Sequence, residues 1–336
     1  MAHPPLLLLE HVNLNVSDPD LARKFYVEGL GGKLNLVGTN DRQVHINLGF
    51  SQFHLPFKLS VKNREPVQSS QIWAGHLELT TCEELSELSK RLQENFAASS
   101  CSNVSVEEEY DDELTSWSSQ SRKDTESSRL KALHVQCPYG NKFIVSKASE
   151  ESLGARDLSR LASGSDRLIS MPSAIHMCKY GSAKHIASFY TQILRCSVTL
   201  EEADAQRQSG ARCVVHFGGL PPNYPQCAEQ SLIYYEQEEA PESITKAYDT
   251  SEVSKYHICV YMSSQDAYQA AFRRAQTAGL LYINERFQGG PPEFASSDTW
   301  KVAESCGQFR VKDLSCPVTG TASIFVTIMA SKWDPM

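Results

Sequence analysis

The chain has 336 residues, of which 41% are hydrophobic and 21% are charged, so it is long enough for two ordinary domains with apolar cores. Its formal net charge is −8 and it has no basic stripe, which argues against nucleic acid as a partner, because phosphate binding needs clustered Lys and Arg. The apolar run at residues 6–9 is too short for a signal peptide or a membrane span. We therefore expect a soluble, cytoplasmic protein.

The chain contains ten cysteines, and none of them forms a Cys-x-x-Cys pair. In a reducing compartment such residues are mostly free thiols, either buried or at the surface. The spacing therefore does not support a zinc ribbon.

Four similar segments along the chain each open with a short strand pattern that carries a histidine. The four histidines are His11, His76, His176 and His257. Around each of them apolar residues alternate as a strand requires, and a helix-like stretch follows. This internal repeat predicts four strand–helix units. It limits the folds that the chain can form and indicates the histidines as candidate site residues.

Unit one predicts the order β-α-β-β-β. Its expected elements are a strand at residues 8–16, a helix with apolar positions at 21–30, and strands at 33–37, 44–48 and 53–57. The run Ser17-Asp18-Pro19-Asp20 is a helix-start signal, because Asp or Ser caps a helix and Pro suits its first turn.

Unit two follows the same order, with an insertion after its helix. Its expected elements are a strand that opens at residue 72, a helix at 83–96, and strands at 130–136 and 142–146. Residues 99–129 are rich in Ser, Glu and Asp, so we predict a flexible loop there. The polar stretch at 149–172 is the predicted interdomain linker.

Units three and four repeat the pattern in the second half of the chain. Their expected elements are helices at residues 184–194 and 265–278, and strands that open at 174 and 256 and continue at 214–218, 232–235, 309–314 and 324–330. The predicted domains are therefore residues 1–148 and 173–336.

Strand alternation predicts which side chains face a site. His11, Asn13 and Asn15 share one face of their strand, and the apolar residues between them share the other. His76 and Glu78 are arranged in the same way. We expect the apolar faces to pack on helices that lie outside two paired sheets, and the histidines to line a shared cavity.

Three runs of the sequence carry a resemblance to a known family: His11-Val-Asn-Leu-Asn-Val, Ala22-Arg-Lys-Phe-Tyr-Val-Glu-Gly-Leu-Gly-Gly, and Cys137-Pro-Tyr-Gly-Asn-Lys-Phe-Ile. They resemble the opening strand, the first helix and the D-P-x-G-N hairpin of the vicinal oxygen chelate superfamily, with Cys137 in place of Asp. That superfamily includes glyoxalase I, extradiol dioxygenases and bleomycin-resistance proteins. The resemblance implies an α+β fold with tandem glyoxalase-like domains, in which each pair of βαβββ units forms a half-open barrel.

The resemblance also implies a ligand set, because metal-dependent members take their ligands from the first and last strands of paired units. Carried over by position, His11, His54 and His76 fill three ligand sites, and Ile144 stands where Glu is common. Such a set would hold Zn²⁺, Fe²⁺, Ni²⁺ or Cu²⁺. Glu78 is the candidate catalytic base, since it lies two residues from His76 on the same face.

The second pair of units carries fewer ligand candidates. His176 and His257 match the first-strand sites, Tyr234 falls near the last-strand site, and residues 324–326 contain no carboxylate. We interpret this pair as a decayed or repurposed copy, in which His176 and His257 have a structural or ligand-lining role. His45, His134 and His216 lie on middle strands and are interpreted as ordinary polar positions.

Two main functions remain open from the sequence. One is a metal-dependent lyase, isomerase or dioxygenase that acts on an oxygen-rich small molecule, with its centre in the N-terminal domain. The other is a metal-free small-molecule-binding protein of the bleomycin-resistance type, and a third reading is a scaffold with vestigial sites. We expect no membrane or nucleic-acid partner. A homodimer stays open, because related folds form their barrels both within one chain and across two.

Overall fold

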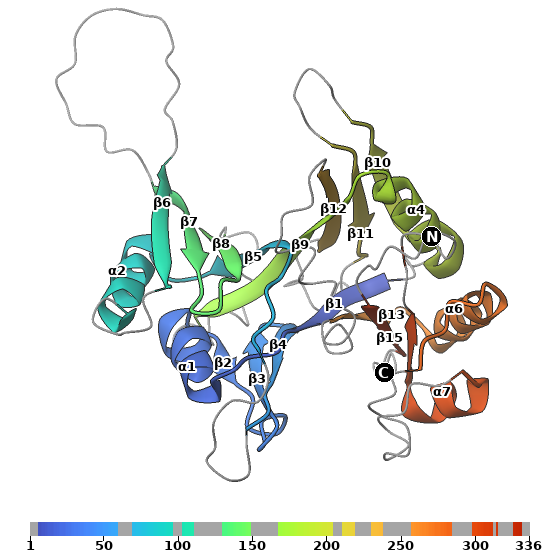
Figure 1. Ribbon diagram of the computed structural model, residues 1–336, viewed down its shortest axis with the longest axis horizontal. Helices are drawn as coiled ribbons and strands as arrows, with labels where there is room; N and C mark the ends of the chain where they lie inside the picture. The colour runs from blue at the N-terminus through green and yellow to red at the C-terminus, as the bar shows by residue number, and fades with distance from the viewer. Residues whose placement is uncertain are drawn as a thin grey trace, which may run out of the picture.

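In the computed structural model, the chain is described at residues 6–59, 69–96, 103–110, 130–148, 167–203, 210–218, 230–237, 257–283, 298–311, 314 and 325–330. Over these ranges it forms two mixed β-sheets and a few helices, which confirms the predicted α+β class. Figure 1 shows one sheet above the other, with α1 and α2 at one end of the molecule and α4, α6 and α7 at the other. Among the described helices, none has the length and apolar character needed to cross a membrane.

The first sheet has seven strands in the order β14-β15-β13-β1-β4-β3-β2. They are β1 (Leu6–Asn13), β2 (Lys33–Leu34), β3 (Gln43–Leu48), β4 (Ser51–Pro56), β13 (His257–Met262), β14 (Gln308–Val311) and β15 (Phe325–Met329). Strands β1 and β13 meet in an antiparallel seam at its centre. The first unit of the chain therefore shares a sheet with the fourth.

The second sheet has eight strands in the order β10-β11-β12-β9-β5-β8-β7-β6. They are β5 (Gly75–Thr81), β6 (Ser105–Tyr110), β7 (Leu130–Gln136), β8 (Lys142–Lys147), β9 (Leu168–Lys179), β10 (Ser197–Glu201), β11 (Arg212–His216) and β12 (Ser231–Gln237). Its central seam is β5–β9, so units two and three share this sheet. The predicted division into residues 1–148 and 173–336 stays a prediction, and strand pairing crosses it in both sheets.

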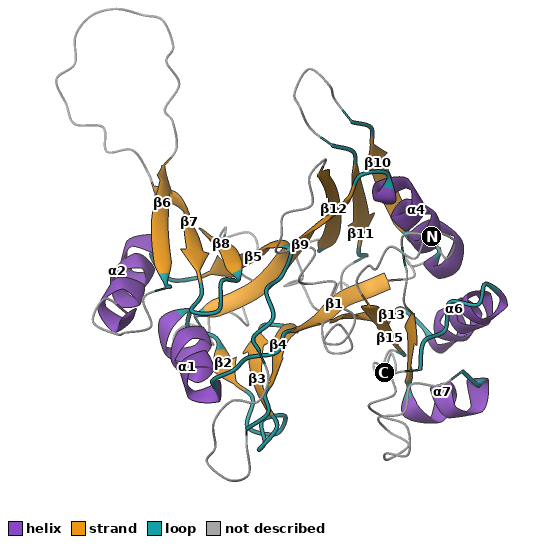
Figure 2. Cartoon of the chain, viewed as in Figure 1, coloured by secondary structure: helices purple, strands orange, loops and turns teal. Residues whose placement is uncertain are grey.

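A helix follows the first strand of each unit, as predicted, and α7 is an additional helix that the sequence analysis did not predict (Figure 2). The helices are α1 (Pro19–Arg23), the π-helical segment η1 (Lys24–Gly29), α2 (Leu85–Phe96), α4 (Ser182–Phe189), the π-helical segment η2 (Tyr190–Leu194), α6 (Gln265–Thr277) and α7 (Trp300–Cys306). The predicted start of the first helix is confirmed: the Asp18 side chain accepts hydrogen bonds from the backbone N–H groups of Asp20 and Leu21, at 2.9 and 3.0 Å.

The main core lies between the two sheets and contains the helices. Tyr26 of η1 packs against Phe53 of the first sheet and Phe143 of the second, with ring centroids 5.0 and 5.9 Å away. At the other end, Phe272 of α6 packs on Phe309 of the first sheet, 5.4 Å between centroids. The expectation of helices outside the sheets is therefore wrong, because the apolar face of each sheet turns inward. Each sheet keeps a polar face that points away from the other sheet, which we call its front.

Two predicted irregular stretches contain strands. Residues 105–110 of the predicted flexible insertion form the edge strand β6, which pairs with β7. The end of the predicted linker belongs to β9, which begins at Leu168. The remaining parts of both stretches, 97–102 with 111–129 and 149–166, lie outside the described residues.

Candidate metal centre on the seven-stranded sheet

Four histidines meet on the front of the seven-stranded sheet, and we call them the histidine cluster. They are His257, His11, His54 and His45, on the neighbouring strands β13, β1, β4 and β3. The His54 ring stacks between those of His11 and His45, with both centroid separations at 3.7 Å. The Nε2 atoms of His11 and His257 are 3.1 Å apart. The cluster therefore joins the first and last units of the chain.

Strand register explains why these side chains meet. Asn13 stands opposite His257 on one side and opposite His54 on the other, and His54 stands opposite His45. Residues that face each other across neighbouring strands project to the same side of a sheet. The four positions therefore form one row across the front, and His11 lies two residues from Asn13 on the same side.

Burial disfavours the charged form of three of the clustered histidines. Burial, followed by the nearby His45 and Arg310, lowers the pKa of His11 to about 3. Burial and the neighbouring His11 hold the pKa of His54 well below its usual value, and burial also lowers the pKa of His45, although Glu10 acts in the opposite direction on both. Neutral imidazole is the form that can ligate a metal ion.

Neighbouring side chains orient the rings. Nε2 of His54 lies 2.9 Å from Oε1 of Gln52, which can only accept, so Nδ1 of His54 keeps its lone pair. Nδ1 of His11 contacts the carboxylate of Glu10, so Nε2 of His11 is left to face His257. Such partners fix the tautomer of metal-binding histidines.

The donor set fits a metal ion. Two nitrogen ligands about 2.05 Å from an ion stand roughly 2.9 Å apart at a right angle and roughly 3.3 Å apart at a tetrahedral angle. The separation of 3.1 Å between the Nε2 atoms of His11 and His257 lies within that range. In the same region of the front, Oδ1 of Asn13, which stands opposite His257, is buried and has no hydrogen-bond partner among the described residues. Buried polar atoms of this kind indicate a group that completes the site.

Comparisons with known proteins agree with the architecture. No family model matches the sequence, and no curated protein matches it. Glyoxalase I from Zea mays is similar in structure, with a TM-score of 0.53 and 12% identity over 98% of this chain and 92% of that one. A protein from Bacillus subtilis subsp. subtilis str. 168 that is proposed to be a dioxygenase has a TM-score of 0.50 and 10% identity, over 98% of this chain and 87% of that one.

The chain has a glyoxalase-like fold. The predicted α+β, tandem glyoxalase-like fold class is thereby confirmed, since both similar structures match nearly the whole chain. At identities of 12% and 10% the likeness concerns the fold, and chemistry must be argued from the site.

The arrangement of the two sheets separates the histidines of the predicted ligand set. His11 and His54 lie together, as expected, but His76 lies on β5 in the eight-stranded sheet. Tyr26 packs between the backs of the two sheets, so the fronts that carry His54 and His76 point in opposite directions. The ligand set implied by the resemblance requires units one and two to share a sheet. In the structure, β1 of unit one pairs instead with β13 of unit four.

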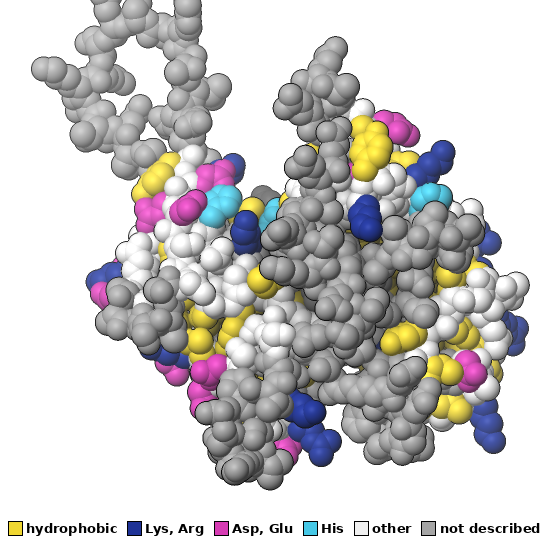
Figure 3. Space-filling model, in the orientation of Figure 1, with side chains coloured by type: hydrophobic (Ala, Val, Ile, Leu, Met, Phe, Trp, Pro, Cys, Tyr) yellow, Lys and Arg dark blue, Asp and Glu magenta, His cyan; other side chains and the backbone are white. Residues whose placement is uncertain are grey.

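Glu78 accompanies His76 on the front of the eight-stranded sheet. Burial lowers the pKa of His76, while Glu78 raises it and His134 and Lys142 lower it. Figure 3 shows histidine, acidic and basic side chains side by side near β6 and β7, where Glu109 binds His134 and Lys131 at 2.8 Å each. This front therefore carries charged groups, in contrast to the histidine cluster, in which His11 is buried and the other three histidines are partly buried.

His176 does not match the first-strand site that the repeat suggested. It stands opposite Gly75 and beside Tyr234, on the back of the eight-stranded sheet, where it is buried against Trp73. Burial lowers the pKa of His176 to about 3. Tyr234 also faces the back, and its hydroxyl is 2.7 Å from that of Tyr190. Of the two roles that the sequence left open, these positions therefore favour the structural one.

Sequence reasoning missed two residues of the cluster region. His45 was interpreted as an ordinary polar position, although it stands directly opposite His54. Glu10 was not considered, because strict alternation puts it on the apolar face. A carboxylate on that face, next to a histidine, is the signal that could have indicated an irregular strand.

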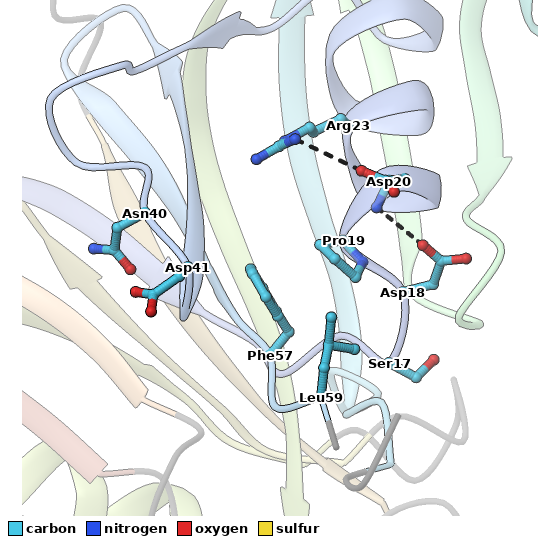
Figure 4. Close-up of a pocket in the computed structure, with 9 residues that line it drawn as sticks. All are labelled: Ser17, Asp18, Pro19, Asp20, Arg23, Asn40, Asp41, Phe57 and Leu59. Carbon is cyan, nitrogen blue, oxygen red and sulfur yellow. Dashed lines mark hydrogen bonds and ion pairs between the residues drawn. The ribbon is translucent and has the colours of Figure 1, made fainter. Parts of the chain in front are cut away.

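A separate surface pocket of about 410 Å³ lies beside the N-terminus of α1 (Figure 4). It is lined by Ser17, Asp18, Pro19, Asp20, Arg23, Asn40, Asp41, Phe57 and Leu59. None of the four clustered histidines lines it. Within the pocket, Nη1 of Arg23 lies 3.6 Å from Oδ1 of Asp20. The pocket is therefore distinct from the candidate centre.

Proposed function

We propose that the protein is a metal-dependent enzyme of the vicinal oxygen chelate type, with its centre at the histidine cluster. His11, His54 and His257 are the proposed ligands, and an oxygen-rich small molecule is the proposed substrate class. The observation that carries the proposal is the 3.1 Å separation of the Nε2 atoms of His11 and His257, from opposite ends of the chain. Zn²⁺, Fe²⁺, Ni²⁺ and Cu²⁺ all suit such a nitrogen set.

The side chains of the centre would hold the ligands in place and exclude water. The stacked His45 supports the His54 ring, and Gln52 holds its Nε2. A metal bound here would act as a Lewis acid on the substrate's oxygens. Thr327 stands opposite Cys259, which in turn stands opposite His11, so all three face the front. The buried hydroxyl of Thr327 has no hydrogen-bond partner among the described residues. We propose it as a donor to the substrate.

The proposed centre draws on both predicted domains, so a centre confined to the N-terminal domain is replaced by one shared between unit one and unit four. The ligand set His11, His54 and His76, with Glu78 as base, stays a prediction. The positions of His76 and Glu78 on the other sheet argue against it.

Metal content tests the proposal. The protein is purified without chelator or affinity tag, and elemental mass spectrometry is applied to the wild type, His257→Ala and His76→Ala. We expect near one equivalent of a transition metal in the wild type and in His76→Ala, and its loss in His257→Ala. The reverse pattern would support the sequence-derived ligand set. No metal in any sample, with failed reconstitution by Zn²⁺, would favour the metal-free binding protein.

A further inference from the structure

A β-bulge lies at the centre of the seven-stranded sheet. Leu9 stands opposite Val260 and His11 stands opposite Cys259, so Glu10 is an additional residue between two consecutive pairs. Leu9 and Val260 are fully buried at the back. A bulge lets two consecutive side chains turn to one side, which regular alternation forbids. Glu10 and His11 therefore both reach the front.

The carboxylate of Glu10 is held on two sides. One of its oxygens contacts Nδ1 of His11, and the thiol of Cys259 also donates a hydrogen bond to the carboxylate. One ligand atom from each of these three residues lies within 4.8 Å of the others. The side chains of His11 and Glu10 are only 8% and 12% exposed, so water competes little for these contacts.

These contacts determine which nitrogen of His11 is available. A carboxylate can only accept, so the hydrogen of the His11 ring lies on Nδ1 whether the imidazole is neutral or charged. In the neutral ring, Nε2 then carries the lone pair, and it faces Nε2 of His257 at 3.1 Å. Carboxylates that hold the second nitrogen of a metal-binding histidine commonly raise metal affinity 10–100-fold, roughly.

We propose that Glu10 is a positioning residue of the metal centre, which holds His11 as the Nδ1–H tautomer and directs Nε2 toward the ion shared with His257. The inference rests on the proposed function. The bulge then has a role in the centre, because Glu10 reaches the same face as His11 only as the additional residue of the bulge. Cys259, from unit four, then anchors a carboxylate of unit one.

A competing arrangement would place the ion directly among Glu10, His11 and Cys259. That site would need the Nδ1 hydrogen of His11 and the thiol hydrogen of Cys259 to leave, and both of these hydrogens are donated to Glu10. The hydrogen bonds therefore favour the positioning role. The two arrangements predict different effects of an uncharged glutamine at position 10.

The test combines a tautomer measurement with a binding measurement. Long-range ¹H–¹⁵N correlation NMR of the metal-free protein reports the His11 tautomer in the wild type, Glu10→Ala and Glu10→Gln, and titration with Zn²⁺ gives the affinity. We expect Nδ1–H in the wild type and in Glu10→Gln, whose amide oxygen still accepts. In Glu10→Ala we expect a shift toward Nε2–H and a roughly 10–100-fold weaker affinity. Glu201→Ala, which removes an exposed partner of Arg212 on the other sheet, should match the wild type in both measurements.

The outcomes are separable. An unchanged His11 tautomer in Glu10→Ala would overturn the inference, and so would an unchanged zinc affinity. Equal loss of zinc in Glu10→Gln and Glu10→Ala, with a sulfur-to-metal absorption band in the Co²⁺ form, would also overturn it and assign Glu10 and Cys259 as ligands. If the wild type binds no Zn²⁺, the proposed function fails, and the tautomer shift alone decides whether Glu10 positions His11.

Discussion

The two central seams of the molecule, β1–β13 and β5–β9, join the opening strands of two units in the same antiparallel way and yet place their histidines differently. In the β1–β13 seam, His11 stands opposite Cys259, and both His11 and His257 reach the front. In the β5–β9 seam, His76 stands opposite Ile175, so His176 falls opposite Gly75 on the back. A shift of one residue in register exchanges the two faces of a strand. The repeated histidine therefore forms a cluster in one sheet and a single core residue in the other.

The electrostatic difference between the two fronts follows from that register. The seven-stranded sheet gathers four imidazoles on its front, where burial lowers the pKa values of His11, His54 and His45. The eight-stranded sheet places Ile175 opposite His76, and its ion pairs lie at an exposed edge. Substitutions at particular residues of each sheet can test how far this difference depends on them.

Gly75→Ala should have the largest effect. A Cβ at this position would lie 2.2 Å from the backbone oxygen of Ile175, and the φ angle of +137° disfavours side chains, so the β5–β9 seam would have to open. We expect the free energy of unfolding to fall by roughly 3 kcal/mol in denaturant titration. The matched control is Gly181→Ala, at φ +82° with no atom within 4 Å, which should cost about 1 kcal/mol. Equal effects would show that the close approach is unimportant.

His54→Phe, compared with His45→Phe, tests the seven-stranded sheet. Both changes keep a flat ring in the stack, whose separations are 3.7 Å, but only the first removes a proposed ligand. We expect zinc affinity to fall about 100-fold in His54→Phe, which is about 2.7 kcal/mol, and to change less than about threefold in His45→Phe. Calorimetric titration with Zn²⁺ measures both, and a larger loss in His45→Phe would move the centre toward β3.

His176→Phe should reduce the sensitivity of the fold to acid. Burial lowers the pKa of His176 from 6.5 to about 3 in the folded state, so the unfolded chain takes up a proton first. The stability contribution is complete above pH 6.5 and is lost as pH falls toward 3, by about 2 kcal/mol at pH 5. Denaturant titrations at pH 7 and pH 5 should show a smaller decrease in the variant. The same decrease in both proteins would exclude His176 as a source of acid lability.

Tyr190→Phe should have the smallest effect. Its hydroxyl is 2.7 Å from that of Tyr234 in the buried back of the eight-stranded sheet, and its loss removes one hydrogen bond. We expect a decrease of about 1 kcal/mol in the free energy of unfolding, with unchanged zinc affinity, because the pair lies against the eight-stranded sheet and the cluster lies on the seven-stranded one. A loss of zinc binding in this variant would mean that the two sheets are coupled more tightly than the separate seams suggest.

Much of the fold could be predicted from the sequence, because the signals are local. The cap at Asp18, the alternation after His11 and the apolar spacing of the helix at 85–96 each depend on neighbouring residues. The choice of partner for each opening strand could not be predicted in the same way. Four strands with similar patterns can pair in several combinations, and tertiary packing around Tyr26 and Phe143 decides among them.

The candidate site was predictable in part for the same reason. His11 and His54 belong to one unit, so alternation within that unit placed both on one face. The third partner depends on which unit lies across the seam, and strict alternation hides a residue at a bulge. Unit four lies across the seam from unit one, so His257 takes the place of His76 in the cluster. Glu10 lies at the bulge, so alternation does not indicate that it reaches the front.

The pairing of the first unit with the fourth also bears on how the protein is made. His11 and His257 are separated by 246 residues, so at roughly 5–20 residues per second the ribosome needs roughly 12–50 s between them. During that interval β1 has no seam partner, while β5 and β9 can already pair. The eight-stranded sheet can thus be complete before the last strand of the seven-stranded sheet has been synthesised. The exposed edge of β1 is then the segment that a nascent-chain chaperone would need to shield.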